Sequence, residues 1–317
     1  MQSCELILKA GAPREEWLAV RNTGIGGSDA GVILGLNPYK SPWQLWLEKT
    51  GQTEPDDLSM NEYVYWGTKQ EPLVAERFFE ETGKRVQRRG TLRSRTHPWM
   101  LANVDRMIVG EKAGLEIKTA NAFAGKDWAD DELPDSYYAQ CLHYMAVTGY
   151  TKWYIAALIG GNHYVQKEIP RNEEDIRLLI RKEKEFWELV ETKTPPPVDG
   201  SESCAAALRV KWDREETGLT IDLPEDAAAI IEDIEESKRI IDTEKARQQL
   251  AKNRLMEMMG AAETGIVGDH KVTWKTQAGR ETVSLADMKK KDRTSYEALK
   301  ADGLIKVSAP TRVMRIR

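Results

Sequence analysis

The feature that most restricts the fold of this chain is a run of three prolines. The segment from Thr194 to Ser203 reads TPPPVDGSES, and proline lacks the backbone N–H that a helix interior or a central strand requires. Just before it, residues 172–192 place apolar side chains at helical spacing, which predicts an amphipathic helix ending at the prolines. The sequence therefore predicts a first domain over residues 1–195, a linker over residues 196–223 and a separate region over residues 224–317.

The first domain alternates short apolar segments with amphipathic ones. Two helices are expected over residues 70–82 and 136–148. Glycines separate the apolar segments into pairs, as in hairpins. The expected strands cover residues 101–109, 115–119, 152–159 and 163–169. This pattern predicts an α/β (α+β) core in which a short mixed sheet, largely antiparallel, is flanked by helices.

The region after the linker has a different pattern. Residues 224–260 are rich in Ala, Glu, Lys, Ile and Leu, with a heptad seam that is apolar at both ends and polar in the middle. They predict a long helix or helical hairpin packed on its own domain, with a self-associating coiled coil as the alternative. A small β element is expected over residues 270–276, 281–284 and 305–315, around a polar helix near 285–299.

Composition narrows the class of protein and of metal site. The three cysteines and four histidines are scattered through 317 residues, so neither a disulfide framework nor a zinc centre is expected, and a metal would be held by oxygen. No apolar run of about 18 residues and no secretory leader is found, so we expect a cytoplasmic protein with no membrane contact. The net charge of -5 neither predicts nor excludes nucleic-acid binding, because the distribution of charge matters more.

The most informative chemistry lies in Asp105, Glu116 and Lys118. Side chains alternate along a strand, so Glu116 and Lys118 share one face while Leu115 and Ile117 point into the core. Asp105 reaches the same face if the two strands pair as a hairpin. Carboxylates at this spacing suit Mg2+ or Mn2+, which keep several waters and take substrate phosphate as a ligand. The segment therefore predicts a metal site for phosphodiester hydrolysis, in which Lys118 orients the attacking water and balances negative charge.

The alternative for this segment is an exposed hairpin with three charged side chains on its solvated face. The residues around the charges are Leu, Ala, Val and Ile, which favours a buried sheet. Charges beside a buried sheet need a counter-ion or a function.

Two further residues have competing interpretations. Glu71 precedes Pro72, which is common in a first helical turn, so Glu71 is expected at a helix start as a metal ligand or as a dipole-stabilising carboxylate. Gln140 is expected on the helix over residues 136–148, on one face with Tyr137 and Tyr144. That face would line a cleft or simply pack in the core.

Two features indicate binding of phosphate. The segment IGGSDA predicts a glycine turn leading into a helix, where backbone N–H groups, Ser28 and Arg21 would bind a phosphate. The alternative is a glycine turn with Ser28 as the N-cap. Residues 84–95 carry six basic side chains and no acidic one, which indicates either a surface that follows a phosphate backbone or a solvated strand.

Taken together, these segments resemble the YqaJ family of phage-type recombination exonucleases, relatives of lambda exonuclease in the PD-(D/E)XK nuclease superfamily. The resemblance covers about residues 14–195 and keeps the order of the family's motifs. It rests on RNTGIGGSDAGVILGLNPYKSPWQLWLEKTG (residues 21–51), WGTKQEP (66–72), ANVDRMI (102–108), LEIKTA (115–120) and YYAQCLHYMAVTG (137–149).

The resemblance implies a PD-(D/E)XK, restriction-endonuclease-like core and a Mg2+-dependent 5'-to-3' exonuclease. Such an enzyme degrades one strand of linear double-stranded DNA and leaves 3' single-stranded tails for recombination by strand annealing. Two Mg2+ per site are implied, with Mn2+ able to substitute. Implied roles are metal binding by Asp105, Glu116, the backbone carbonyl of Ile117 and Glu71, catalysis by Lys118 supported by Gln140, and 5'-phosphate binding by Arg21 and Ser28.

The resemblance also implies partners: DNA ends, a homo-oligomeric ring and a phage single-strand annealing protein, in a bacterial host cell that carries a phage or prophage. Residues 224–317 would serve oligomerisation or partner binding. Two alternatives remain open. One is a structure-specific endonuclease, or a Cas4-like or RecB-like nuclease, with the same core; the absence of a cysteine cluster argues against an iron–sulfur type. The other is a catalytically silent protein that binds DNA ends.

Overall fold

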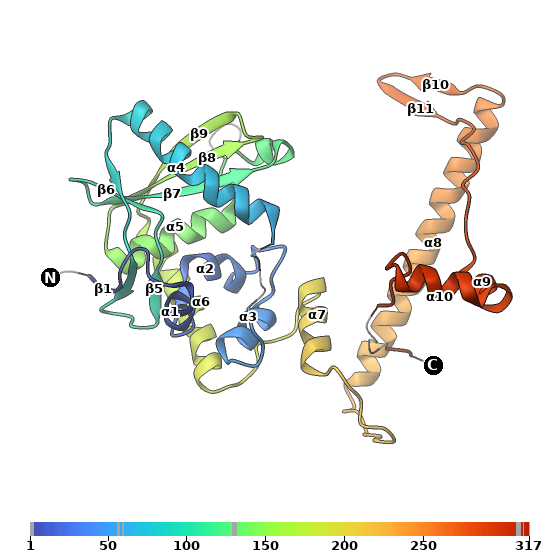
Figure 1. The fold of residues 1–317 in the computed structure, drawn as a ribbon, viewed down its shortest axis with the longest axis horizontal. Coiled ribbons are helices and arrows are strands. Elements are labelled where there is room, and N and C mark those ends of the chain that lie inside the picture. The colour runs from blue at the N-terminus through green and yellow to red at the C-terminus, as the bar shows by residue number, and fades with distance from the viewer. Residues whose placement is uncertain are drawn as a thin grey trace. The chain divides into compact units, whose positions relative to one another are not determined.

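The computed structural model describes residues 3–55, 58, 60–128, 132–308, 312 and 314–316. The chain divides into two compact units, Met1–Trp212 and Asp213–Arg317. Among the described residues, no helix combines the length and apolar character that a membrane crossing requires. The first unit contains all the motif segments quoted above, and its two sheets position them (Figure 1).

The larger sheet has five strands in the order β3-β6-β7-β8-β9. The central strand, β7, pairs antiparallel with β6 and parallel with β8, and the other pairs are antiparallel. The predicted short mixed sheet, largely antiparallel, is therefore confirmed. The strands are β3 (Val86–Gln87), β6 (Arg106–Ile108), β7 (Ala113–Ala120), β8 (Lys152–Ile159) and β9 (His163–Pro170).

Helices cover both faces of this sheet. Leu115 and Ile117 of β7 pack with Phe78 of α4 (Glu62–Thr82) on one face. Glu116 and Lys118 point to the other face and hydrogen-bond to α5 (Asp135–Thr148). The predicted alternation along β7 is confirmed, but the charged face is not solvated, since a helix lies over it. The exposed-hairpin alternative is therefore wrong.

Helix α4 begins nine residues earlier than Glu71, which overturns the expected helix start. Asn61 is its N-cap and accepts hydrogen bonds from the N–H groups of Tyr63 and Val64. Pro72 lies inside the helix, where it removes one backbone hydrogen bond. Because Glu71 lies in the helix interior, a dipole-stabilising role at the N-terminus does not apply to it.

The second sheet has the order β1-β4-β5-β2 and adjoins the first at Asn103 to Asp105. The expected strand over residues 101–109 is interrupted here: β5 belongs to one sheet and β6 to the other. The interruption leaves Asp105 just before β6, at the junction of the two sheets. The strands of the second sheet are β1 (Cys4–Leu8), β2 (Ile25–Gly26), β4 (Thr91–Ser94) and β5 (Met100–Ala102).

Short N-terminal helices place the IGGSDA segment against α5. Helix α1 (Arg14–Arg21) leads into β2, and α2 (Gly27–Ile33) follows it directly, as the glycine turn predicted. A Cβ on Gly27 would lie 2.5 Å from the Tyr144 ring of α5. Only glycine therefore allows α2 to approach the α5 face that carries Gln140 and Tyr144.

The range expected as a linker contains a packed helix. Helix α6 (Glu173–Glu191) ends before the prolines, close to its predicted bounds. After them, α7 (Glu202–Lys211) buries Cys204 and Ala207 against α3 (Pro42–Lys49). The compact unit therefore extends to Trp212. The prolines end α6, but apolar residues that follow them bring the chain back onto the first unit.

The second unit is built on α8 (Ala227–Met259), a single helix rather than a helical hairpin, with no buried residue. A hairpin follows, β10 (Thr264–Val267) with β11 (His270–Thr273). Residues 281–284 and 305–308 form no strand, so the larger β element expected there is wrong. The expected polar helix consists of two, α9 (Leu285–Lys291) and α10 (Arg293–Ala301). Residues 309–311 and 313, which belong to the same expected range, lie outside the described residues.

Candidate active site

Asp105 and Glu116 meet at the junction of the two sheets. The β6–β7 register pairs Arg106 with Leu115, which brings the preceding Asp105 beside Glu116. The N–H of Ile117 donates to Asp105 Oδ2 at 2.8 Å, and Glu116 is buried, 2% exposed. Strand pairing therefore brings the two carboxylates together, as the sequence predicted.

This pair has the electrostatics of a cation site. Burial, followed by the negative charge of Glu116, raises the pKa of Asp105 well above its ordinary value. Glu116 Oε2 is buried and has no hydrogen-bond partner among the described residues. A buried carboxylate oxygen without a donor is costly unless a cation satisfies it. The oxygen ligands fit Mg2+ or Mn2+, which take few protein carboxylates and complete their shells with water and phosphate.

Lys118 lies beside the carboxylates in its charged form. Its Nζ donates to Glu116 Oε1 at 2.5 Å and to Gln140 Oε1 at 3.0 Å. Burial disfavours the ammonium, but Glu116 and Asp105 outweigh it and raise the pKa of Lys118 to about 12. The side chain is therefore a fixed positive charge at any pH near neutrality.

Gln140 holds these groups together from α5. Its Nε2 donates to Glu116 Oε1 at 2.7 Å and to the Tyr144 hydroxyl at 2.8 Å. Tyr144 in turn donates to the carbonyl of Asn103 at 2.9 Å. The predicted α5 face with Gln140 and Tyr144 therefore lines the site, and it links both sheets to Lys118.

Glu71 lies near the pair but is not part of it. It forms an ion pair with Arg106, which is 8% exposed and also donates to the Asp105 carbonyl. Within the described parts of the chain, no three acidic, His or Cys side chains are grouped closely enough to hold a metal. Of the five predicted catalytic residues, the structure thus brings together Asp105, Glu116, Lys118 and Gln140. The fifth, Glu71, is instead paired with Arg106.

Arg21 and Ser28 meet at the start of α2. Arg21 Nη2 lies 3.2 Å from Ser28 Oγ and 3.2 Å from Asp29 Oδ1. Ser28 is in the first turn of α2, whose N-cap is Gly26, so its interpretation as an N-cap is wrong. Asp29 is buried and accepts from the Gly26 N–H at 3.0 Å.

Asp29 and Lys49 hold Arg21 in place. Lys49 Nζ lies 2.9 Å from Asp29 Oδ2, and both side chains are 2% exposed. Burial disfavours the Asp29 carboxylate, but Lys49, Arg21 and the Gly26 N–H outweigh it and lower its pKa. Asp29 therefore stays ionised and orients the Arg21 guanidinium. The sequence shows Asp29 within IGGSDA, but not its buried partner, Lys49.

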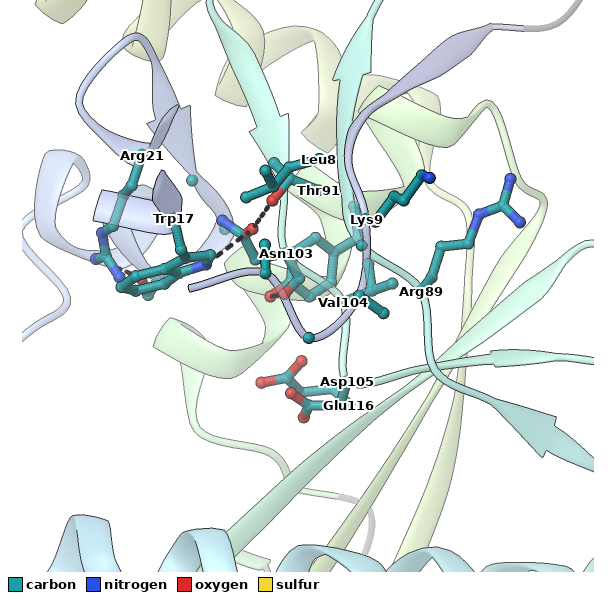
Figure 2. A pocket seen from close by; sticks show the side chains of 18 of the residues that line it. Leu8, Lys9, Trp17, Arg21, Arg89, Thr91, Asn103, Val104, Asp105 and Glu116 are labelled. Atoms are coloured by element: carbon teal, nitrogen blue, oxygen red, sulfur yellow. Dashed lines mark hydrogen bonds between the residues drawn. The ribbon is translucent and has the colours of Figure 1, made fainter. Parts of the chain in front are cut away.

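A cleft of about 360 Å3 joins these groups. Arg21 lines one part of it, and Asp105 and Glu116 line another (Figure 2). Ser28, beside Arg21, also lines it. The cleft thus places a cationic anchor and a buried carboxylate pair in one space.

Asn103 is a cleft residue that sequence reasoning missed. Its Oδ1 accepts from the Trp17 indole at 3.2 Å and from the Thr91 hydroxyl at 2.6 Å (Figure 2). Two donors on Oδ1 leave the amide NH2 as the group available to the cleft. The sequence signal for Asn103 is its place two residues before Asp105. Residues two apart in an extended segment point to the same side.

The basic segment over residues 84–95 is only partly engaged in the cleft. It contains β3 and β4, and several of its basic residues pair with acids, as Lys84 does with Glu111 at 2.9 Å. Arg89 lines the cleft.

Sequence comparison identifies relatives. Residues 16–151 match the YqaJ-like viral recombinase domain. The chain is 44% identical to the YqaJ protein of Bacillus subtilis (strain 168) over 269 residues, which is 83% of each protein.

Structural comparison identifies the fold. The alkaline exonuclease LHK-Exo from Laribacter hongkongensis matches with a TM-score of 0.50 and 21% identity, over 57% of this chain and 94% of that one. LHK-Exo in complex with dAMP gives 0.51 and 22%, over the same shares. The fold is therefore the PD-(D/E)XK-like fold of phage-type exonucleases, as predicted.

The 44% identity over 83% of the chain and the match over residues 16–151 point to the same family. The chain belongs to the YqaJ family, whose domain is a YqaJ-like viral recombinase domain.

Proposed function

We propose that this chain is a Mg2+-dependent 5'-to-3' exonuclease that degrades one strand of linear double-stranded DNA and leaves 3' single-stranded tails for recombination by strand annealing. One observation carries the proposal: a single cleft contains a buried carboxylate pair with an unsatisfied oxygen and an arginine–serine anchor for a terminal phosphate. Membership of the YqaJ family and the fold of an alkaline exonuclease support it.

The contacts support a division of roles. The metal ions, two per site or one, would be held by Asp105 and Glu116. The family resemblance adds the Ile117 carbonyl, and Glu71 would join on release from Arg106. When bound, Mg2+ supplies polarisation of the phosphate and stabilisation of the departing 3'-oxyanion. Lys118 balances negative charge that develops on the phosphate, and Gln140 fixes the position of its ammonium.

Arg21 and Ser28 would select the substrate end. A 5'-phosphate carries more charge than a phosphodiester and accepts hydrogen bonds from both residues at once. A strand that begins with a 5'-phosphate is therefore held with its first phosphodiester over the carboxylates, and hydrolysis releases a 5'-mononucleotide.

The direct test uses linear duplex DNA with a 5'-phosphate on one strand. In Mg2+, the wild-type protein is expected to digest the phosphorylated strand faster and to release 5'-mononucleotides. Lys118→Ala is expected to reduce the rate by about 10^2- to 10^3-fold, the usual effect of losing one group that stabilises transition-state charge. Preferential loss of the unphosphorylated strand, or undiminished cleavage by Lys118→Ala, would show that the proposal is wrong.

A structure-specific endonuclease is the second candidate. A second pocket of about 470 Å3 shares Trp17, Arg21 and Ser28 with the cleft, so space continues beyond the anchor, as a strand passing through would need. Cleavage of covalently closed circular duplex at a rate matching that of linear duplex would favour this candidate. Binding of DNA ends with no metal-dependent turnover would establish the other alternative, a protein that binds ends without catalysis.

The proposed partners are DNA ends, other copies of the chain in a ring and a phage single-strand annealing protein, in the cytoplasm of a host that carries a phage or prophage. Helix α8 exposes Ile230, Ile241 and Met258, which favours a role for residues 213–317 in assembly. Truncation after Trp212, the end of the first unit, is expected to lower the oligomeric mass measured by light scattering. An unchanged subunit number in the truncated protein would contradict this role.

A further inference from the structure

A basic pair, Lys9 and Arg89, lies on the cleft and belongs to neither the metal site nor the phosphate anchor. Both side chains are exposed and both line the cleft. Figure 2 shows them on one side of Asp105 and Glu116, with Arg21 on the other side. The carboxylate pair therefore has a cationic group on each side of it.

Backbone packing brings Lys9 and Arg89 together. The β1–β4 pairing is irregular between Leu6 and Leu8, and Lys9 follows this irregularity. A Cβ on Gly90 would lie 1.8 Å from the Leu8 carbonyl oxygen. Only glycine therefore permits the segment before β4 to approach the end of β1, and this contact fixes the two basic residues near each other.

The charges of this pair are not neutralised within the part of the chain that the structure describes. No acidic side chain there lies within 4 Å of either residue. Other basic residues of the same region do have acidic partners: Lys84 pairs with Glu111 at 2.9 Å and Arg95 with Glu5 at 3.7 Å. Two unpaired cations at a cleft that also holds a metal site are suited to an anionic ligand.

We propose that Lys9 and Arg89 bind the phosphodiester on the 3' side of the scissile phosphate, in the strand that is digested. The inference rests on the proposed function, because it assumes that a DNA strand crosses the cleft from the Arg21 anchor over the carboxylates. Arginine offers a planar fork of donors and lysine a mobile point charge, and both bind phosphate oxygens. The pair would keep the shortened strand in the cleft when a mononucleotide leaves.

The test measures binding rather than turnover, so that it does not depend on cleavage. Fluorescence anisotropy in Ca2+ gives Kd for a 5'-phosphorylated duplex with the full-length protein. The double variant Lys9→Ala/Arg89→Ala is expected to raise Kd by at least roughly tenfold. The slope of log Kd against log salt is expected to fall by about 1 for each lost contact. Lys112→Ala/Arg181→Ala, which removes two exposed basic residues that do not line the cleft, should change neither.

A neutral linkage identifies the phosphate. Replacing the phosphodiester 3' of the scissile one by a methylphosphonate is expected to weaken wild-type binding about as much as the double variant does, and to add little in that variant. An equal loss from the neutral linkage in both proteins would overturn the proposal, because the pair would then bind elsewhere. Absence of nuclease activity in Mg2+ would contradict only the proposed function. The comparison of Kd values for the two proteins and the two DNAs is made in Ca2+ and does not require cleavage.

Discussion

Asp105→Asn is expected to abolish metal-dependent cleavage, with a loss on the order of 10^3-fold or more, while leaving a folded protein. The carboxylate is one of two that meet at the sheet junction, and an amide oxygen carries no charge to hold a divalent cation. Rates of nucleotide release from linear duplex in Mg2+ give the loss, and calorimetric titration with Mn2+ gives the change in metal affinity.

The same substitution is expected to preserve or increase stability without metal. Burial and Glu116 raise the pKa of Asp105 in the folded state. A group with a raised folded pKa stabilises the fold below its unfolded pKa, and this contribution is lost as pH rises through the folded pKa. Asparagine does not titrate, so wild type should lose stability relative to Asp105→Asn as pH rises. A variant that unfolds more easily than wild type at neutral pH would assign Asp105 a structural role instead.

Glu183→Leu is expected to have the largest effect on stability, about 3–5 kcal/mol, because it breaks a buried ion pair and leaves its partner behind. Glu183 of α6 and His143 of α5 are both 0% exposed and lie 2.8 Å apart. His143 Nε2 lies 2.9 Å from the Leu101 carbonyl, so it donates there. Burial disfavours the imidazolium, but Glu183 outweighs it and raises the pKa of His143.

Urea unfolding of three proteins tests this pair. Glu183→Gln keeps a hydrogen-bonding group beside His143 and should retain most of the stability lost in Glu183→Leu. Glu185→Leu on the same helix removes only an exposed pair with Lys182, and its effect should stay within about 0.5 kcal/mol. If Glu183→Leu changed the free energy of unfolding no more than Glu185→Leu does, the pair would not hold α5 on α6.

The central strand and the direction of its side chains were predictable because their signals are local. Alternation along β7 separates Glu116 and Lys118 from Leu115 and Ile117 by the geometry of any strand, and glycines mark the turn before it. Whether the charged face of β7 is exposed to solvent depended instead on which element covers it. That cover, α5, is distant in the sequence, so only the apolar character of neighbouring residues indicated it.

The errors arose where a local signal competes with packing. Pro72 is typical of a first helical turn, but Asn61 caps α4 earlier and the apolar face of α4 is buried on the sheet, which outweighs one lost hydrogen bond. The prolines after α6 correctly end that helix, yet burial of Cys204 and Ala207 returns the chain to the first unit. The ion pair between Lys49 and Asp29 joins two different helices, and no sequence pattern indicates that these residues meet.

The proposed function requires a divalent-metal site at Asp105 and Glu116 at which DNA is hydrolysed. The most direct measurement is the initial rate of nucleotide release from 5'-phosphorylated linear duplex as Mg2+ is titrated, for wild type and for Glu116→Gln. The rate is expected to rise from zero in EDTA to saturation for wild type and to stay near zero for Glu116→Gln at every Mg2+ concentration. Release in EDTA, or equal saturating rates for the two proteins, would contradict the proposed function.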